Sequence, residues 1–169
     1  IPYRIYGGLK FYDRKEIKDA IAYLKLIHNV DDSQSLRRII NVPKRAIGDT
    51  TIKNLQQFAD EYDVSMFEAV KLLDTVENDF SPKAKDKLKE FCKLILKFKD
   101  SQNSYSLHEF VTLVIEKTGY LAELQLQNNP EAEADIENLQ ELVNVAGEFI
   151  PEDENNILVE FLQQVALVS

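Results

Sequence analysis

Residues 81–100 read SPKAKDKLKEFCKLILKFKD, and this stretch decides the fold class. Ser81 before Pro82 is typical of a helix start, because serine caps free backbone N–H groups and proline suits the first helical position. The apolar residues that follow recur at the spacing of one helical face: Leu88, Phe91, Cys92 and Ile95. The stretch therefore predicts a long helix with one buried face and a lysine-rich face in solvent.

The rest of the chain repeats this pattern. The capping-box spacing, in which a side-chain oxygen precedes a glutamate by three residues, occurs at Asp13, Ser65 and Ser106. Five glycines and five prolines are too few for a turn-rich β fold. The sequence predicts an all-α, irregular multi-helix bundle, in which only residues 3–6 (YRIY) form a short N-terminal strand or extended segment.

Length and charge limit the possible partners. The chain has 169 residues, of which 44% are hydrophobic, and this predicts one domain with a real core. The net charge of −9 counts against nucleic acid, but residues 1–53 carry 11 lysines and arginines against 6 acids, while residues 101–169 carry 1 against 13. Salt screens distant charges beyond about 10 Å, so a basic patch in the first third can still bind phosphates.

Several kinds of chemistry have no motif here. The sequence contains no phosphate-binding loop of an ATPase and no dinucleotide-binding glycine motif. His28 and His108 lie far apart, and the single Cys92 excludes an internal disulfide and a cysteine-based zinc site. We expect no catalytic residue, no metal site and, because no apolar run approaches about 18 residues, no membrane contact. The start at Ile1, without an initiator methionine or signal peptide, predicts a piece of a longer, cytoplasmic chain.

Two loops carry binding chemistry. In residues 41–51 (NVPKRAIGDTT), Lys44 and Arg45 precede Gly48, which leads into a helix whose N-terminus favours phosphate. In residues 116–120 (EKTGY), a lysine, a hydroxyl and a glycine backbone can hold a second phosphate. The alternatives are a capped helix with two solvent cations and a glycine helix end. Neither loop contains base-reading chemistry, so binding would be to the DNA backbone.

Taken in order, these segments resemble one known family. Residues 2–8, with Phe11, Arg14 and residues 16–19 (EIKD), resemble the entry to the inserted subdomain of UvrD/PcrA/Rep-type superfamily 1 DNA helicases. Residues 38–48 (RIINVPKRAIG) resemble that family's R-I-I-N-x-P-x-R-G-I-G element. Residues 118–120 (TGY) and 136–141 (IENLQE) resemble its [ST]-G-Y element and its R-x-E-N-x-x-E-like helix.

The resemblance implies a role within a larger enzyme. Residues 1–40 would be a flank of motor domain 2A with its connector, and residues 41–169 a helical 2B subdomain that binds duplex DNA and regulates unwinding. The parent would be an ATP-dependent three-prime to five-prime helicase of DNA repair or replication, using ATP and magnesium bound elsewhere, with no cofactor or catalysis in this segment. Its partners would be the duplex DNA backbone, the motor domains and possible regulatory proteins. Carried over, the DNA-binding residues are Lys44, Arg45, Ile47, Gly48, Thr51, Thr118, Gly119 and Tyr120.

Two departures from the family pattern weaken the expected duplex affinity. Ala46 stands where the family has the first glycine of G-I-G, and Asp135 stands near where it has arginine. A helical protein-interaction module without DNA contact therefore stays open as the alternative. The two differ in salt dependence, because only phosphate binding falls steeply with salt.

Overall fold

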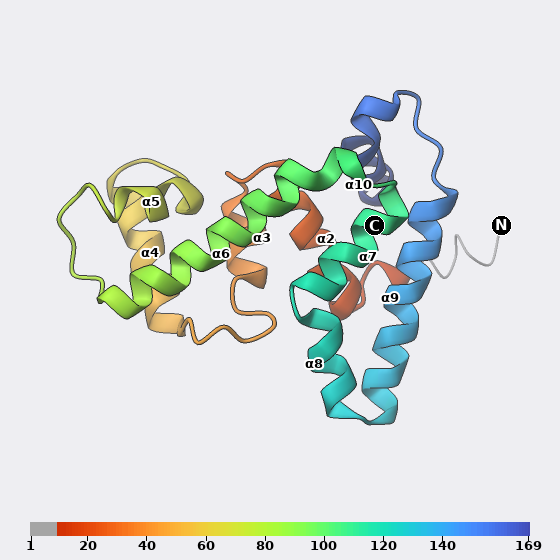
Figure 1. Cartoon of the computed structure of the whole chain (residues 1–169), viewed down its shortest axis with the longest axis horizontal. Helices are drawn as coiled ribbons and strands as arrows, with labels where there is room; N and C mark the ends of the chain where they lie inside the picture. Colours follow the sequence, from red (N-terminus) through yellow and green to blue (C-terminus); the bar gives the residue numbers. More distant parts are fainter. Residues whose placement is uncertain (1–9) are drawn as a thin grey trace. The chain divides into compact units, whose positions relative to one another are not determined.

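The computed structural model describes residues 10–169, and this part of the chain is helical without any strand, which confirms the all-α prediction (Figure 1). The strand expected at residues 3–6 lies outside the described residues. The helices are α2 (Lys15–His28), α3 (Ser33–Ile39), α4 (Asp49–Glu61), α5 (Met66–Leu72), α6 (Pro82–Ser101), α7 (Leu107–Lys117), α8 (Tyr120–Gln127), α9 (Pro130–Glu148) and α10 (Ile157–Val168). Two short 3₁₀ turns, Gln102–Ser104 and Glu154–Asn156, precede α7 and α10.

The chain forms two compact units, which are described separately. The first unit contains the residues up to Leu24 together with Ser101–Ser169, and the second contains Lys25–Asp100. None of the helices within residues 10–169 combines the length and the apolar character needed to cross a bilayer.

Side-chain caps begin the helices where the sequence predicted them. The Ser65 hydroxyl accepts the backbone N–H of Glu68 at the start of α5. At α7, Ser106 and Glu109 form the full reciprocal capping box, with the Ser106 N–H donating to the Glu109 carboxylate at 3.0 Å. The Ser81 hydroxyl accepts an N–H of the first turn of α6 at 3.1 Å. These bonds satisfy N–H groups that have no partner inside their own helix.

The predicted cap at Asp13 is wrong. Helix α2 begins at Lys15, and the carbonyl of Arg14 accepts the Lys18 N–H, so the cap position falls on Arg14 and not on Asp13. Glu16, the other half of the predicted box, is only 5% exposed and accepts a hydrogen bond from the Asn138 amide of α9 at 2.7 Å. A buried carboxylate needs such a donor, and the tertiary partner takes precedence over a cap on the chain's own backbone.

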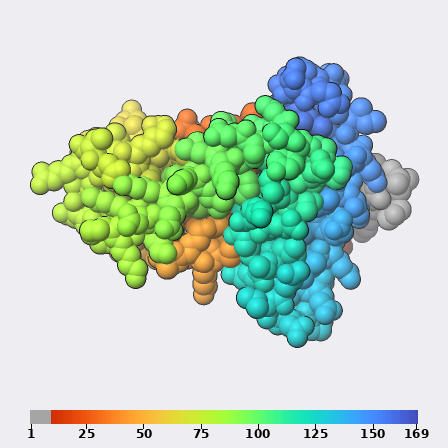
Figure 2. All heavy atoms as spheres, viewed as in Figure 1, coloured from red at the N-terminus to blue at the C-terminus, as the bar shows by residue number. Residues whose placement is uncertain are grey.

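In the second unit, α5 packs against both α3 and α4. The unit's core is built from apolar side chains on these helices and on α6: Leu36, Ile39, Leu55, Phe67, Leu88, Phe91 and Ile95. Helix α6, green in Figure 2, contributes much of the surface on the viewed face. Its buried stripe is the one predicted from residues 81–100, and the buried Cys92 lies on it.

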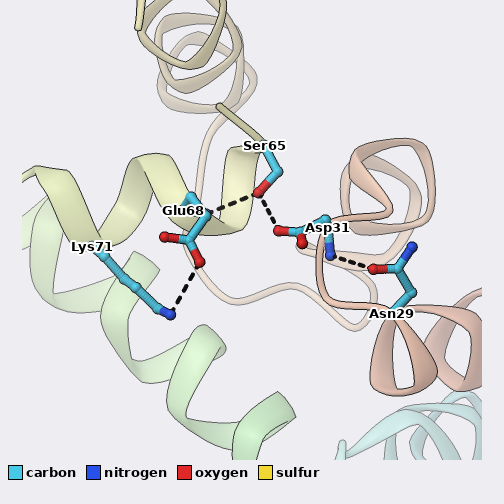
Figure 3. Close-up of polar contacts among 5 residues, drawn as sticks. All are labelled: Asn29, Asp31, Ser65, Glu68 and Lys71. Atoms are coloured by element: carbon cyan, nitrogen blue, oxygen red, sulfur yellow. Dashed lines mark hydrogen bonds and ion pairs between the residues drawn. The ribbon is translucent and has the colours of Figure 1, made fainter. Parts of the chain in front are cut away.

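Polar contacts fix the turn that follows α2 within the second unit. Figure 3 shows the Ser65 hydroxyl donating to Asp31 at 2.7 Å, while the Asp31 N–H donates to the Asn29 side chain. The Lys99 ammonium of α6 donates to the backbone carbonyls of Ile27 and His28 at 3.2 and 3.0 Å. These carbonyls end α2 and have no partner within the helix, so Lys99 satisfies them.

In the first unit, α7 packs on α9, and α8 contacts both helices. Figure 1 shows α8 and α9 as antiparallel neighbours joined by a tight turn. The sequence patterns did not predict α8. Only Thr118 and Gly119 separate it from the end of α7, because Gly119 takes the left-handed conformation (φ 87°) and redirects the chain there.

Candidate nucleic-acid interface

Asn41 organises the first predicted loop. Its side-chain oxygen accepts the backbone N–H of Arg45 at 2.7 Å and that of Ile47 at 3.3 Å. One amide therefore holds the two ends of the turn that carries the cations. Sequence reasoning did not single out this role, although an asparagine at the head of a turn is a known signal for side-chain bonds to nearby backbone.

Arg45 binds the protein itself. Its Nη1 donates to the carbonyls of Ile39 and Ile40, both at 3.0 Å, and lies 3.4 Å from that of Pro43. Its guanidinium carbon lies 5.1 Å from the centroid of the Phe91 ring on α6. Arg45 thus satisfies the carbonyls at the end of α3 and fastens the loop to α6, a structural role that goes beyond a charge in solvent.

The other residues of this loop differ in what they present to solvent. The Ile47 side chain is 2% exposed and belongs to the core. Lys44 and Gly48 are exposed, and Thr51 is half-buried in the first turn of α4. Gly48 has an ordinary backbone (φ −72°), and a Cβ added there would meet no atom within 4 Å. The fold of the described residues therefore does not require glycine at position 48.

Ala46 adopts the left-handed conformation, with φ 61°. Side chains with a Cβ disfavour this region, and glycine does not. The family's glycine at this place is thus explained by the turn's own backbone, independently of any approach to DNA.

The second predicted loop turns its side chains inward. Thr118 is buried, and its hydroxyl donates to the Ile115 carbonyl and accepts the Tyr120 N–H, both at 3.3 Å. The Tyr120 hydroxyl donates to the buried Asp19 of α2 at 2.7 Å, and burial together with this carboxylate raises the pKa of Tyr120. The half-buried Gly119 backbone and the exposed Lys117 border the same turn.

With this geometry described, the comparison with known proteins is informative. The sequence profile of the UvrD-like helicase C-terminal domain matches residues 1–169. The chain belongs to this family. It is 38% identical over 167 residues to the ATP-dependent DNA helicase PcrA of Bacillus subtilis (strain 168), covering 99% of this chain and 22% of the relative. It is 37% identical over 172 residues to PcrA of Staphylococcus aureus (strain Mu50) and to PcrA of Staphylococcus epidermidis, covering 100% of this chain and 23% of each relative.

This UvrD-like domain spans less than a quarter of the length of the curated relatives it matches. The recognition of a UvrD/PcrA-type helicase segment from its motifs is confirmed at that level. The finer assignment to a 2B subdomain, the domain boundary at residue 40 and the DNA-binding residues stay predictions.

The two predicted loops of the UvrD-like domain belong to different compact units. Lys44, Arg45, Ile47, Gly48 and Thr51 share one loop and helix start in the second unit. The turn of Thr118, Gly119 and Tyr120 lies in the first unit. Each loop is internally ordered, so each can be tested by itself.

Sequence reasoning missed a buried polar group in the first unit. Asp19 and Glu16 of α2, 2% and 5% exposed, are bound by Tyr120 and Asn138. These carboxylates belong to the stretch 16–19 (EIKD), which carried part of the resemblance. The sequence therefore showed the motif, but it did not show which residues bind its carboxylates.

The metal-ligating and thiol side chains of the UvrD-like domain are scattered or buried in its described part. No group of three or more metal-ligating side chains occurs in residues 10–169. Burial raises the pKa of the Cys92 thiol to about 12, so at neutral pH the sulfur is protonated and a poor nucleophile. The burial agrees with the prediction that Cys92 lies on the buried face of the helix in residues 81–100.

Proposed function

We propose that this chain is the regulatory 2B subdomain, residues 41–169, with a flank of motor domain 2A in residues 1–40, of an ATP-dependent three-prime to five-prime DNA helicase. In this proposal it holds the backbone of duplex DNA, while the motor domains bind ATP and magnesium and perform the catalysis. Its partners are duplex DNA, the motor domains and regulatory proteins, and its setting is cytoplasmic DNA repair or replication. The observation that carries the proposal is the similarity to PcrA helicases along 99% of the chain, loop 38–48 included.

The geometry of the two loops supports separate roles for exposed groups, which contact DNA, and buried groups, which hold the loops in shape. Lys44 supplies an exposed ammonium, and Gly48 supplies open backbone at the start of α4, where the helix dipole favours an anion. Asn41 and Arg45 hold the loop in shape through the carbonyl and N–H contacts described above. The buried Ile47, Thr118 and Tyr120 position the two turns, and their neighbouring backbone and lysines face the phosphates.

Fluorescence anisotropy on a labelled hairpin duplex tests the proposal. We expect Lys44→Ala to weaken binding about fivefold and to lower the slope of log affinity against log salt by about 1, because one phosphate contact is lost. Gly48→Ala should weaken binding and leave that slope unchanged, since it adds a methyl group where the phosphate approaches. Lys97→Ala, which removes another exposed lysine, on α6, is the charge-matched control and should bind as the parent does.

An unchanged binding curve for both Lys44→Ala and Gly48→Ala would refute the DNA-holding role. It would favour the second candidate, a helical protein-interaction module. That alternative is supported by the internal hydrogen bonds of Arg45, Thr118 and Tyr120, because these bonds use the same side-chain groups that would contact phosphate in the DNA-binding proposal. It also draws on the acidic excess of residues 101–169.

A further inference from the structure

A hollow of about 360 Å³ lies at the C-terminal end of α4 in the second unit, between this helix end and the segment 77–80. Aromatic rings form one of its walls. The ring centroids of Phe58 and Tyr62 are 4.8 Å apart, and Phe80 stands edge-on to Phe58 at 6.0 Å. Tyr62 is 41% exposed, which leaves much of its surface open to a ligand. The volume falls within the range of about 300–1,000 Å³ that small-ligand sites occupy.

The hollow is also acidic on both sides. Glu61 lines it from α4, and Glu77 and Asp79 line it from the following segment. No lysine or arginine is among its lining residues. Within residues 10–169 none of these three carboxylates has an ion-pair partner, whereas the nearby Glu68 and Asp74 pair with lysines.

This combination selects one kind of ligand. An aromatic face attracts a guanidinium or ammonium group, and carboxylates bind a guanidinium through charged hydrogen bonds. A phosphate or another acidic ligand would be repelled by the same three charges. An apolar side chain would leave the carboxylates unpaired, so it would gain little from entering.

We propose that this hollow binds an arginine side chain from a basic, extended segment of a partner protein. The inference is independent of the proposed DNA contact. Helix α4 rises about 1.5 Å per residue, so Glu61 lies roughly 20 Å from Gly48 along the helix axis, and Asn54, the lining residue nearest that end, lies roughly 9 Å from it. A partner can therefore occupy the hollow while the opposite end of α4 remains available.

The test is a titration of the full 169-residue chain into a fluorescein-labelled nonapeptide that contains four arginines among glycines, followed by anisotropy. We expect the triple variant Glu61→Gln, Glu77→Gln and Asp79→Asn to weaken binding about tenfold, from the loss of three partly exposed charge pairs. Tyr62→Leu should weaken binding about threefold, because the cation loses its aromatic face. The same peptide with citrulline, which keeps the shape of arginine without its charge, should bind at least tenfold more weakly.

The control keeps the net charge of the triple variant but changes another surface. The substitutions Glu133→Gln, Glu137→Gln and Glu152→Gln neutralise three exposed acids of the first unit. If this control weakens peptide binding as much as the triple variant does, the peptide responds to overall charge and the proposed site is wrong. Equal binding of the arginine and citrulline peptides would overturn it as well. Thermal unfolding of each variant establishes that the fold is kept.

Discussion

The substitution Ala46→Gly tests how the first loop is built. Ala46 has φ 61° and an exposed side chain, so its methyl group contributes strain without compensating burial. A residue with a Cβ loses about 1–2 kcal/mol in the left-handed region. Glycine removes that cost but gives the unfolded chain additional freedom, which offsets about 0.4–1 kcal/mol. We therefore expect Ala46→Gly to stabilise the protein by about 0.5–1 kcal/mol.

Urea denaturation followed by far-UV circular dichroism measures this difference, and thermal unfolding checks it. For a chain of this size 1 kcal/mol corresponds to about 2–4 °C, so the unfolding midpoint should rise by about 1–4 °C. Ala134→Gly is the matched control, because it removes the same methyl group from an exposed position inside α9. In an ordinary helical backbone this change should destabilise by about 1 kcal/mol.

If Ala46→Gly raises the free energy of unfolding and Ala134→Gly lowers it, the difference between the two positions comes from backbone conformation alone. If Ala46→Gly lowers the free energy of unfolding as much as Ala134→Gly does, the left-handed conformation at position 46 is not a source of strain. The explanation offered above for the family's glycine would then be wrong.

Two further predictions concern the buried polar contacts of the first unit. Tyr120→Phe removes a hydrogen-bond donor from the 2%-exposed Asp19, and it should lower the free energy of unfolding in urea by about 1.5–3 kcal/mol. The control Tyr105→Phe, at an exposed position, should change the free energy of unfolding by less than about 0.5 kcal/mol. Equal effects of the two substitutions would contradict the assigned bond. Burial and the neighbouring Glu16 raise the pKa of Asp135 above its ordinary 3.8, so the folded protein holds this proton more tightly than the unfolded chain. Above the pKa of the folded state the ionised carboxylate destabilises the folded protein, and this destabilisation decreases as pH falls through that pKa and the carboxylate is protonated. Asp135→Asn should therefore stabilise by roughly 0.5 kcal/mol at pH 7, with a gain that shrinks toward pH 4, and a pH-independent gain would refute this reasoning.

Local chemistry accounts for most of what sequence reasoning predicted correctly. The starts of α5, α6 and α7 follow from Ser65, Ser81 and Ser106, because a cap bonds to N–H groups within three residues along the chain. The buried stripe of α6 follows from helical periodicity in the same way. Short α8 escaped prediction because its start depends on the backbone of Gly119, which sequence reasoning assigned only to the end of α7.

In the candidate site, too, the sequence predicted the local features, and the tertiary structure decided the contacts between distant residues. The sequence by itself determined which residue types line the two loops. It also determined membership of the helicase family, because the motifs can be recognised in the sequence without a structure. Only the tertiary structure decided that Tyr120 meets Asp19 across 101 residues and that Glu16 meets Asn138 across 122. The physical reason is desolvation: once folding buries a carboxylate, it takes whatever donor lies within about 3 Å in space. Distance along the chain gives no information about which donor that will be.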